Sequence, residues 1–236
     1  MAQKPKQTQE PNGGFMAQRR QILNKNSNFV VQEAYKSLRT NVRFFLRDES
    51  CKKICITSAA ASEGKSITML NLAISIAQSG QKVILIDADL RRPALARLLV
   101  EKAAPGLSNV LADLASAQEA IRPEVYPNLD ILFSGDVPPN PSEILGSAEM
   151  EKLIADLSQR YDYVLVDTPP VGVVSDANLV ASLMDGVLLL VRQNRTKKDE
   201  VRRAVNNLQL TGARILGYIL NGVVPEHGDS YGYYYY

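Results

Sequence analysis

Apolar residues recur with two different periods along this chain. From residue 29 to 47 they return every three or four positions, which predicts an amphipathic helix. Beyond residue 50, short runs rich in Val, Ile and Leu alternate with stretches of helical period. Strands are expected at 53–58, 82–87, 129–133, 163–167, 186–191 and 214–221, and helices from residue 66, within 94–116, at 142–160, near 177–184 and near 197–210.

Strands that are apolar throughout and are joined by helices are typical of a parallel sheet buried on both faces. The predicted fold class is therefore α/β, a parallel twisted sheet with helices on both faces and right-handed crossovers. Such sheets bind ligands beyond the carboxyl ends of their strands. Three of these ends carry polar or acidic residues, beginning at Ser58, Asp87 and Asp167. We therefore expect one site, assembled from separate strands at a single edge of the sheet.

The segment from Ser58 to Ser66 reads Ser-Ala-Ala-Ala-Ser-Glu-Gly-Lys-Ser, follows a predicted strand and opens a predicted helix. Backbone amides in such a loop can bind phosphate, and the helix dipole favours the anion. Lys65 is expected to contact the β- and γ-phosphates of a nucleotide, and the Ser66 hydroxyl to bind Mg²⁺. The general pattern has glycine where this chain has Ala59, so the first turn must be one that does not need a positive φ. The residues expected to contact the nucleotide are Ser62, Glu63, Gly64, Lys65, Ser66 and Ile67.

Two further segments supply carboxylates. Asp87 and Asp89 end the second predicted strand, and residues two apart on an extended segment point the same way, so both can face a bound Mg²⁺-nucleotide. Asp167 ends a buried strand and could hold Mg²⁺ through water. Helix or strand capping is the competing interpretation of Asp87 and of Asp167. Arg91 and Arg92 follow the first pair, and either could neutralise phosphate or lie at the surface.

Composition narrows the partners and the location. Lys plus Arg number 27 and Asp plus Glu number 25, a net charge of +2 that gives no reason to expect nucleic acid as a partner. A single histidine leaves almost nothing from which to build a His-based catalytic centre. No run reaches the ~20 apolar residues that a bilayer requires, so a cytoplasmic location is expected. Residues 1–28 are expected to form a disordered basic arm.

The chain closes on a cluster of tyrosines without apolar periodicity. Five of its ten tyrosines lie within the last six residues. Aromatic side chains ordinarily contribute to a core, so exposed phenols behind a phosphate loop suggest a substrate. Residues 225–236 are expected to be a flexible tail, and 29–224 the folded domain. The candidate phosphoacceptors are Tyr231, Tyr233, Tyr234, Tyr235 and Tyr236.

These motifs resemble those of the bacterial tyrosine kinases, a group of deviant P-loop ATPases related to MinD and ParA. The resemblance rests on the loop from Thr57 to Ser66, on Val83-Ile-Leu-Ile-Asp-Ala-Asp-Leu-Arg91 and on Val164-Leu-Val-Asp167, and it extends from about Glu33 to the tail. The family loop reads Pro-Gly-Glu-Gly-Lys-Ser, whereas this chain has Ala61-Ser62 in place of Pro-Gly. MinD-type relatives carry an extra lysine near the start of the loop, and no lysine stands between Ser58 and Ala61.

The resemblance implies an ATP-dependent protein-tyrosine autokinase that regulates capsule or exopolysaccharide synthesis. Lys65 and Ser66 would then bind ATP and Mg²⁺, Asp87 and Asp167 would organise the metal and the lysine, and Asp89 would accept the tyrosine proton. The implied catalytic residues are Lys65, Asp87, Asp89 and Asp167, and the implied metal ligands are Ser66, Asp87 and Asp167.

The resemblance also implies partners. Glu33, Lys36 and Arg39 match the family's Glu-x-x-Arg-x-x-Arg oligomerisation motif, with Lys36 in place of the first arginine, and an intrahelical ion pair is the competing interpretation. The expected assembly is a ring, an octamer by resemblance, in which each tail enters a neighbouring site. A membrane-anchored polysaccharide co-polymerase would activate the kinase at the inner face of the membrane, and a cognate tyrosine phosphatase would oppose it.

Two other functions fit part of the sequence. A MinD- or ParA-like nucleotide-switched ATPase explains the phosphate loop and leaves the tail without a role. A non-enzymatic protein could use the tail as a stacking segment for a partner. Removal of the tail would leave ATP turnover unchanged in the first case, and substitution of Lys65 would leave partner binding unchanged in the second.

Overall fold

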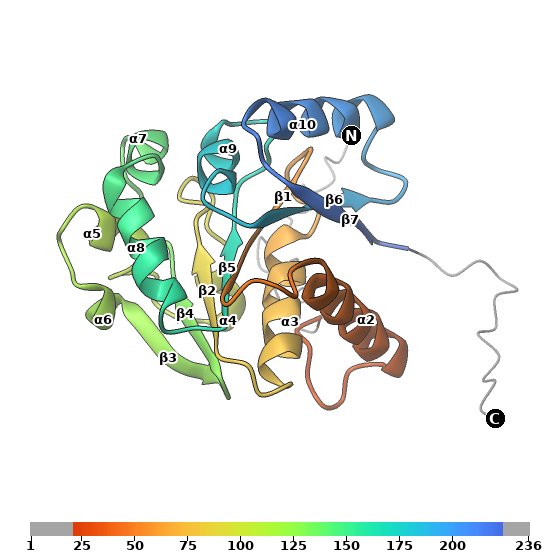
Figure 1. The fold of residues 1–236 in the computed structure, drawn as a ribbon, viewed down its shortest axis with the longest axis horizontal. Coiled ribbons are helices and arrows are strands. Elements are labelled where there is room, and N and C mark those ends of the chain that lie inside the picture. Colours follow the sequence, from red (N-terminus) through yellow and green to blue (C-terminus); the bar gives the residue numbers. More distant parts are fainter. Residues whose placement is uncertain (1–20, 224–236) are drawn as a thin grey trace, which may run out of the picture.

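The computed structural model describes residues 21–223. Within this range the chain forms a seven-stranded sheet in the order β3-β4-β2-β5-β1-β6-β7, in which every neighbouring pair is parallel except β3 with β4 (Figure 1). The strands are β1 (Lys52–Ser58), β2 (Val83–Asp87), β3 (Ile121–Tyr126), β4 (Leu129–Leu132), β5 (Tyr163–Asp167), β6 (Gly186–Arg192) and β7 (Ile215–Asn221).

Helices cover both faces of the sheet (Figure 1). One core cluster joins β-strand side chains to α5, α8, α9 and α10, and the other joins them to α2, α3 and α4. Alternate residues of β1 serve the two layers, since Ile54 and Ile56 belong to the second cluster and Cys55 to the first. The helices are α2 (Phe29–Phe45), α3 (Lys65–Ala77), α4 (Leu95–Leu99), α5 (Leu107–Leu111), α6 (Ala117–Ala120), α7 (Pro141–Leu145), α8 (Ala148–Ser158), α9 (Asp176–Ala181) and α10 (Lys198–Leu210).

The register of the central strands brings the functional strand ends together. Asp87 pairs with Asp167 across β2 and β5, and Asp167 pairs with Ile56 across β5 and β1. Because these strands are parallel, their carboxyl ends meet at one edge, where the chain continues from β1 into the phosphate loop. The α/β fold class is confirmed, and the strand ends at Ser58, Asp87 and Asp167 lie at one edge of the sheet as predicted.

Two secondary-structure predictions need correction. The sequence pattern does not predict β3, which is antiparallel to β4, so the sheet is mixed. The predicted helix over 142–160 is two helices, α7 and α8. It breaks at Gly146 because the Ser147 side chain accepts a hydrogen bond from the amide of Met150 and so begins a new helix.

The end of the predicted basic arm belongs to the fold. Leu23 is only 4% exposed, and its amide donates to the Asn71 side chain of α3 at 2.8 Å. The Asn71 amide in turn donates to the carbonyl of Gln21 at 2.9 Å. The prediction of a disordered arm over 1–28 is therefore wrong for 21–28, and the rest of the arm lies outside the described residues, as does the predicted tail 225–236.

Across residues 21–223, none of the helices combines the length and the apolar character that a bilayer span requires.

Candidate active site

The loop between β1 and α3 turns through two left-handed residues. Ser62 has φ of 60° and Gly64 has φ of 104°, whereas Ala59 does not have a positive φ. The expectation that the first turn does not need glycine at residue 59 is therefore confirmed. Gly64 precedes the first residue of α3, so the loop amides lie at a helix N-terminus, where an anion is favoured.

Two of the predicted nucleotide contacts are restricted by their surroundings. Ile67 is 9% exposed and its side chain belongs to the apolar core beneath α3, so only its backbone can face a nucleotide. The Glu63 side chain is fully buried and accepts a hydrogen bond from the Thr196 hydroxyl, so it stabilises the loop from inside.

Asp167 stands at the centre of the site with its charge uncompensated by hydrogen bonds. The residue is fully buried, and neither carboxylate oxygen has a hydrogen-bond partner of ordinary geometry among residues 21–223. Burial raises the pKa of Asp167 to about 7, although the charge of Lys65 and the Ser66 hydroxyl oppose the rise. A buried polar atom without a partner is costly in a folded protein and commonly marks a functional group. The competing interpretation, that Asp167 caps an element, finds no support here.

Lys65 is the cation of the site. It is the first residue of α3 and is only 7% exposed, a degree of burial that is rare for a lysine unless an opposite charge lies nearby. Its positive charge attracts the Asp167 carboxylate and so opposes the rise in the pKa of Asp167 that burial causes. The structure therefore brings together the loop lysine and the β5 carboxylate, which lie 102 positions apart in the sequence.

Asp87 is held by backbone amides. One carboxylate oxygen accepts from the amide of Asp89 at 3.3 Å, and the other accepts from the amides of Ala94 and Leu95 at 3.3 and 3.1 Å. Burial, reinforced by the negative charge of Asp167, raises the pKa of Asp87 well above its usual range. Asp87 thus binds backbone amides at the start of α4, as the capping interpretation expects, and it lies beside Asp167; its role as a metal ligand stays a prediction.

Asp89 is 8% exposed and accepts a hydrogen bond from the amide of Arg92 at 3.0 Å. Its charge acts on both Asp87 and Asp167, so all three carboxylates share one electrostatic environment. The predicted set of three acids and one lysine is therefore assembled at one edge of the sheet.

The donor set is consistent with a Mg²⁺ ion that also binds phosphate. Within the described part of the chain, no group of three or more His, Cys, Asp or Glu could hold a metal alone. Mg²⁺ commonly uses one or two carboxylates together with substrate phosphates and water. The partnerless oxygens of Asp167 and the neighbouring Ser66 hydroxyl fit that requirement.

The charge of Arg91 is paired with that of Asp176. Its Nε donates to Asp176 Oδ2 at 2.7 Å and its Nη2 to Asp176 Oδ1 at 3.1 Å, and Ser142 completes a three-residue network. Asp176 is fully buried at the start of α9. Sequence reasoning missed this pairing because an acid in the first turn of a helix is ordinary.

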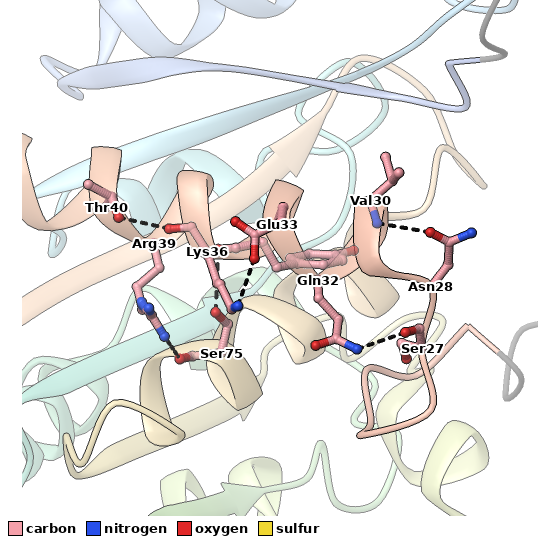
Figure 2. A network of polar contacts seen from close by, with 10 residues as sticks. Ser27, Asn28, Val30, Gln32, Glu33, Lys36, Arg39, Thr40 and Ser75 are labelled. Carbon is pink, nitrogen blue, oxygen red and sulfur yellow. Dashed lines mark hydrogen bonds and ion pairs between the residues drawn. The ribbon is translucent and has the colours of Figure 1, made fainter. Parts of the chain in front are cut away.

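The predicted oligomerisation motif lies on α2, above α3 (Figure 2). Lys36 forms an ion pair with Glu33 at 2.7 Å, with both side chains about half exposed, which is the competing intrahelical interpretation. Arg39 donates to the carbonyl of Ser75 on α3 at 2.6 Å. In this one chain, then, the motif makes contacts within the subunit, and its role between subunits stays a prediction.

Known proteins share both the sequence and the fold. A family model described as an AAA domain matches residues 51–212. The tyrosine-protein kinase YwqD of Bacillus subtilis is 38% identical over 223 residues, which cover 94% of each chain. The kinase domain of the Escherichia coli tyrosine kinase ETK is 36% identical with a TM-score of 0.80, covering 90% of this chain and 87% of that one.

A cell-division ATPase is less similar. MinD of Pyrococcus furiosus is 26% identical with a TM-score of 0.61, covering 72% of this chain and 71% of that one. The fold of residues 21–223 is therefore shared with P-loop ATPases in general, and the closer agreement in sequence and structure is with tyrosine kinases.

Proposed function

Because this chain belongs to the family of bacterial tyrosine-protein kinases, we propose that its own tail is its substrate: the kinase transfers phosphate from ATP to the terminal tyrosines of a neighbouring copy. The observation that carries the proposal is the buried, partnerless carboxylate of Asp167 beside Lys65, in a chain that ends in five clustered tyrosines. A nucleotide-switched ATPase would need the first feature and would leave the second without a use.

In this proposal the loop binds the phosphates and the carboxylates bind the metal ion. The loop amides and Lys65 would bind the β- and γ-phosphates of ATP, which places the γ-phosphorus at the edge of the sheet. Ser66, Asp87 and Asp167 would hold Mg²⁺, which would supply neutralisation of the phosphate charge. Asp87 already accepts three backbone amides, so Asp167 has the greater free capacity as an acceptor.

Phosphoryl transfer to tyrosine needs a proton acceptor as well as a bound ATP. The tyrosine oxygen attacks the γ-phosphorus, the bond to the β-phosphate oxygen breaks, and ADP leaves with that oxygen. The phenol has a pKa near 10, so its proton must depart as the new bond forms. Asp89 is the proposed acceptor, since it lies at the same edge and is not enclosed as Asp87 is.

The proposal places catalysis between subunits of a ring. Glu33 and Lys36 are about half exposed, so a neighbouring subunit could replace their mutual ion pair. Such an exposed pair is worth only about 0.2 to 0.5 kcal/mol, so little is lost when it opens. We further propose a membrane-anchored co-polymerase as activator, recruitment to the inner membrane face, opposition by a tyrosine phosphatase, and control of capsule or exopolysaccharide synthesis.

The test is phosphosite mapping of the purified protein with Mg²⁺-ATP and the activator. Phosphate should appear on Tyr231 and on Tyr233 to Tyr236, and Lys65→Met should abolish it. Tyr218, which is 60% exposed on β7, is the internal control, because accessible but non-substrate tyrosine should stay unmodified. ATP hydrolysis without any phosphotyrosine would reject the kinase proposal.

A mixing experiment tests transfer between subunits. One chain carries Lys65→Met and an intact tail, and the other is active with all five tail tyrosines changed to Phe. Phosphate on the first chain requires transfer in trans. If neither chain is labelled in the mixture while the unaltered protein labels itself, transfer occurs within a subunit.

A further inference from the structure

Two arginines that follow one another closely reach the phosphate loop from the end of β6. The Nη1 atoms of Arg192 and Arg195 each donate a hydrogen bond to the backbone carbonyl of Ser62, both at 3.2 Å. These residues lie 130 and 133 positions from Ser62 in the sequence. Hydrogen bonds from a guanidinium are stronger than neutral ones, and here two are directed at a single carbonyl.

The next residue of the loop is held from two sides. The Thr196 hydroxyl donates to the Glu63 carboxylate and itself accepts from the amide of Arg192 at 2.9 Å, so its only proton is committed to Glu63. The Asn221 side chain, at the end of β7, donates to the Glu63 carbonyl at 2.8 Å. We call the four residues that hold Ser62 and Glu63 the clasp: Arg192, Arg195, Thr196 and Asn221.

At Ser62 the clasp stabilises an unfavourable backbone conformation. Its φ of 60° lies in the left-handed region, which costs a residue with a Cβ about 1 to 2 kcal/mol. Glycine adopts that φ freely, so serine carries a conformational cost here that glycine would not. Because the carbonyl orientation depends on the backbone torsions, two donors on the Ser62 carbonyl favour the conformation that serine disfavours.

We propose that the clasp is a positioning device for the phosphates of ATP, which holds Ser62 in a conformation that glycine would adopt unaided. This inference rests on the proposed function, since it assumes that the loop amides bind phosphate. Arg192, Arg195 and Asn221 act on the loop backbone, and Thr196 acts through the Glu63 side chain. Loop amides that are already oriented bind phosphate without a further ordering cost. Loss of the clasp should therefore raise the KM for ATP and leave kcat nearly unchanged, because the clasp residues form no hydrogen bond with Asp167 at the end of β5 or with Asp89 in the loop after β2.

The experiment is a cycle between the arginines and residue 62. Arg192→Ala/Arg195→Ala is made in the natural chain and in a chain with Ser62→Gly, and the dissociation constant of Mg²⁺-ATP is measured by calorimetry. We expect about tenfold weaker binding in the serine chain, and a loss of threefold or less in the glycine chain. Arg202→Ala/Arg203→Ala is the control, since it removes the same charge from an exposed part of α10.

The cycle has clear contrary results. An equal loss in both chains would mean that the arginines act on the nucleotide directly, and no loss in either would mean that they do not position the loop; both overturn the inference. Failure of the unaltered protein to bind Mg²⁺-ATP would instead reject the proposed function.

Thr196 provides a second, independent test. Thr196→Val keeps the shape of the side chain and removes the proton donated to Glu63, whereas Thr196→Ser keeps the hydroxyl. We expect the valine variant to raise the KM for ATP at least fivefold and the serine variant to stay within twofold of the natural chain. Similar KM values for the two variants would contradict the inference. Thermal melting of both confirms that the comparison is between folded proteins.

Discussion

Arg91 and Asp176 form a side-on ion pair that ties the loop after β2 to the start of α9, through N–O distances of 2.7 and 3.1 Å. Arg91 lies two residues after Asp89, the proposed proton acceptor. The pair therefore fixes one end of the segment on which Asp89 stands, and the backbone amide of Arg92 fixes the Asp89 carboxylate itself.

Arg91→Lys should reduce catalysis more than stability. Lysine cannot reproduce the two-pronged contact with Asp176, so the Asp89 segment loses its fixed position. We expect kcat for tail phosphorylation to fall about tenfold, because small displacements of a reacting group are expensive, with the KM for ATP within twofold. Arg202→Lys, at an exposed ion pair on α10, is the control and should change neither value.

Asp176→Asn should flatten the acid end of the stability profile. Burial alone would raise the pKa of Asp176, but the hydrogen bonds from Arg91 and Ser142 outweigh it and lower the pKa below 3.8. A lowered pKa contributes stability above the unfolded value, and that contribution is lost as pH falls through the folded value. Urea unfolding between pH 6 and pH 3 should show a smaller loss for the variant, and identical slopes would contradict the pairing.

Asp167→Asn should stabilise the nucleotide-free protein while abolishing phosphorylation. The pKa of Asp167 is about 7 in the folded protein and near 3.8 in the unfolded chain. The folded state therefore has its full stability below the unfolded pKa, and it loses stability as pH rises through the folded pKa of about 7, because the buried carboxyl must then ionise. Asparagine does not titrate, so the variant should gain up to about 4 kcal/mol at pH 8 and little at pH 4. Asp156→Asn on the exposed face of α8 is the control. A gain that does not depend on pH would contradict this account.

Gly64→Ala should destabilise the fold through a collision as well as through strain. A Cβ at residue 64 would overlap the Asn221 side-chain amide, and φ is 104°. Gly212 also has a positive φ of 72° but open space around it, so Gly212→Ala measures strain alone, about 1 kcal/mol. We expect Gly64→Ala to cost at least about 1 kcal/mol more in chemical denaturation. Equal costs would show that Asn221 moves aside freely.

Leu23→Ala should show that the fold begins before α2. The side chain is 4% exposed against the core beneath α3, and such truncations cost about 2 to 5 kcal/mol. Val30→Ala, at a residue that is 58% exposed, should stay within about 0.5 kcal/mol in the same urea titration. If Leu23→Ala left the free energy of unfolding unchanged, residues 21–28 would contribute nothing to the folded domain.

The sequence was informative where one local pattern determines the structure. The apolar runs that end at Ser58, Asp87 and Asp167 predict buried parallel strands, and their shared edge follows from general rules of such sheets. The predicted strand at 163–167 coincides with β5, and the predicted helix from residue 66 begins one residue earlier, at Lys65.

Local patterns could not reveal structure that depends on distant partners. Strand β3 contains Pro123 and a residue of positive φ, Glu124, so its alternation is broken, and only its pairing with β4 makes it a strand. The contacts of Arg91 with Asp176 and of Thr196 with Glu63 join residues 85 and 133 positions apart. No spacing rule reaches across such intervals.

The direction of β7 has a geometric consequence for an assembly. This strand is parallel to β6 and ends at Asn221, so the chain leaves the described fold from the same rim that carries the phosphate loop. The end of β7 and the phosphate loop thus lie at the same edge of the sheet. An assembly in which the chain beyond residue 223 reaches a neighbouring phosphate loop would therefore have to bring these rims of the two copies together.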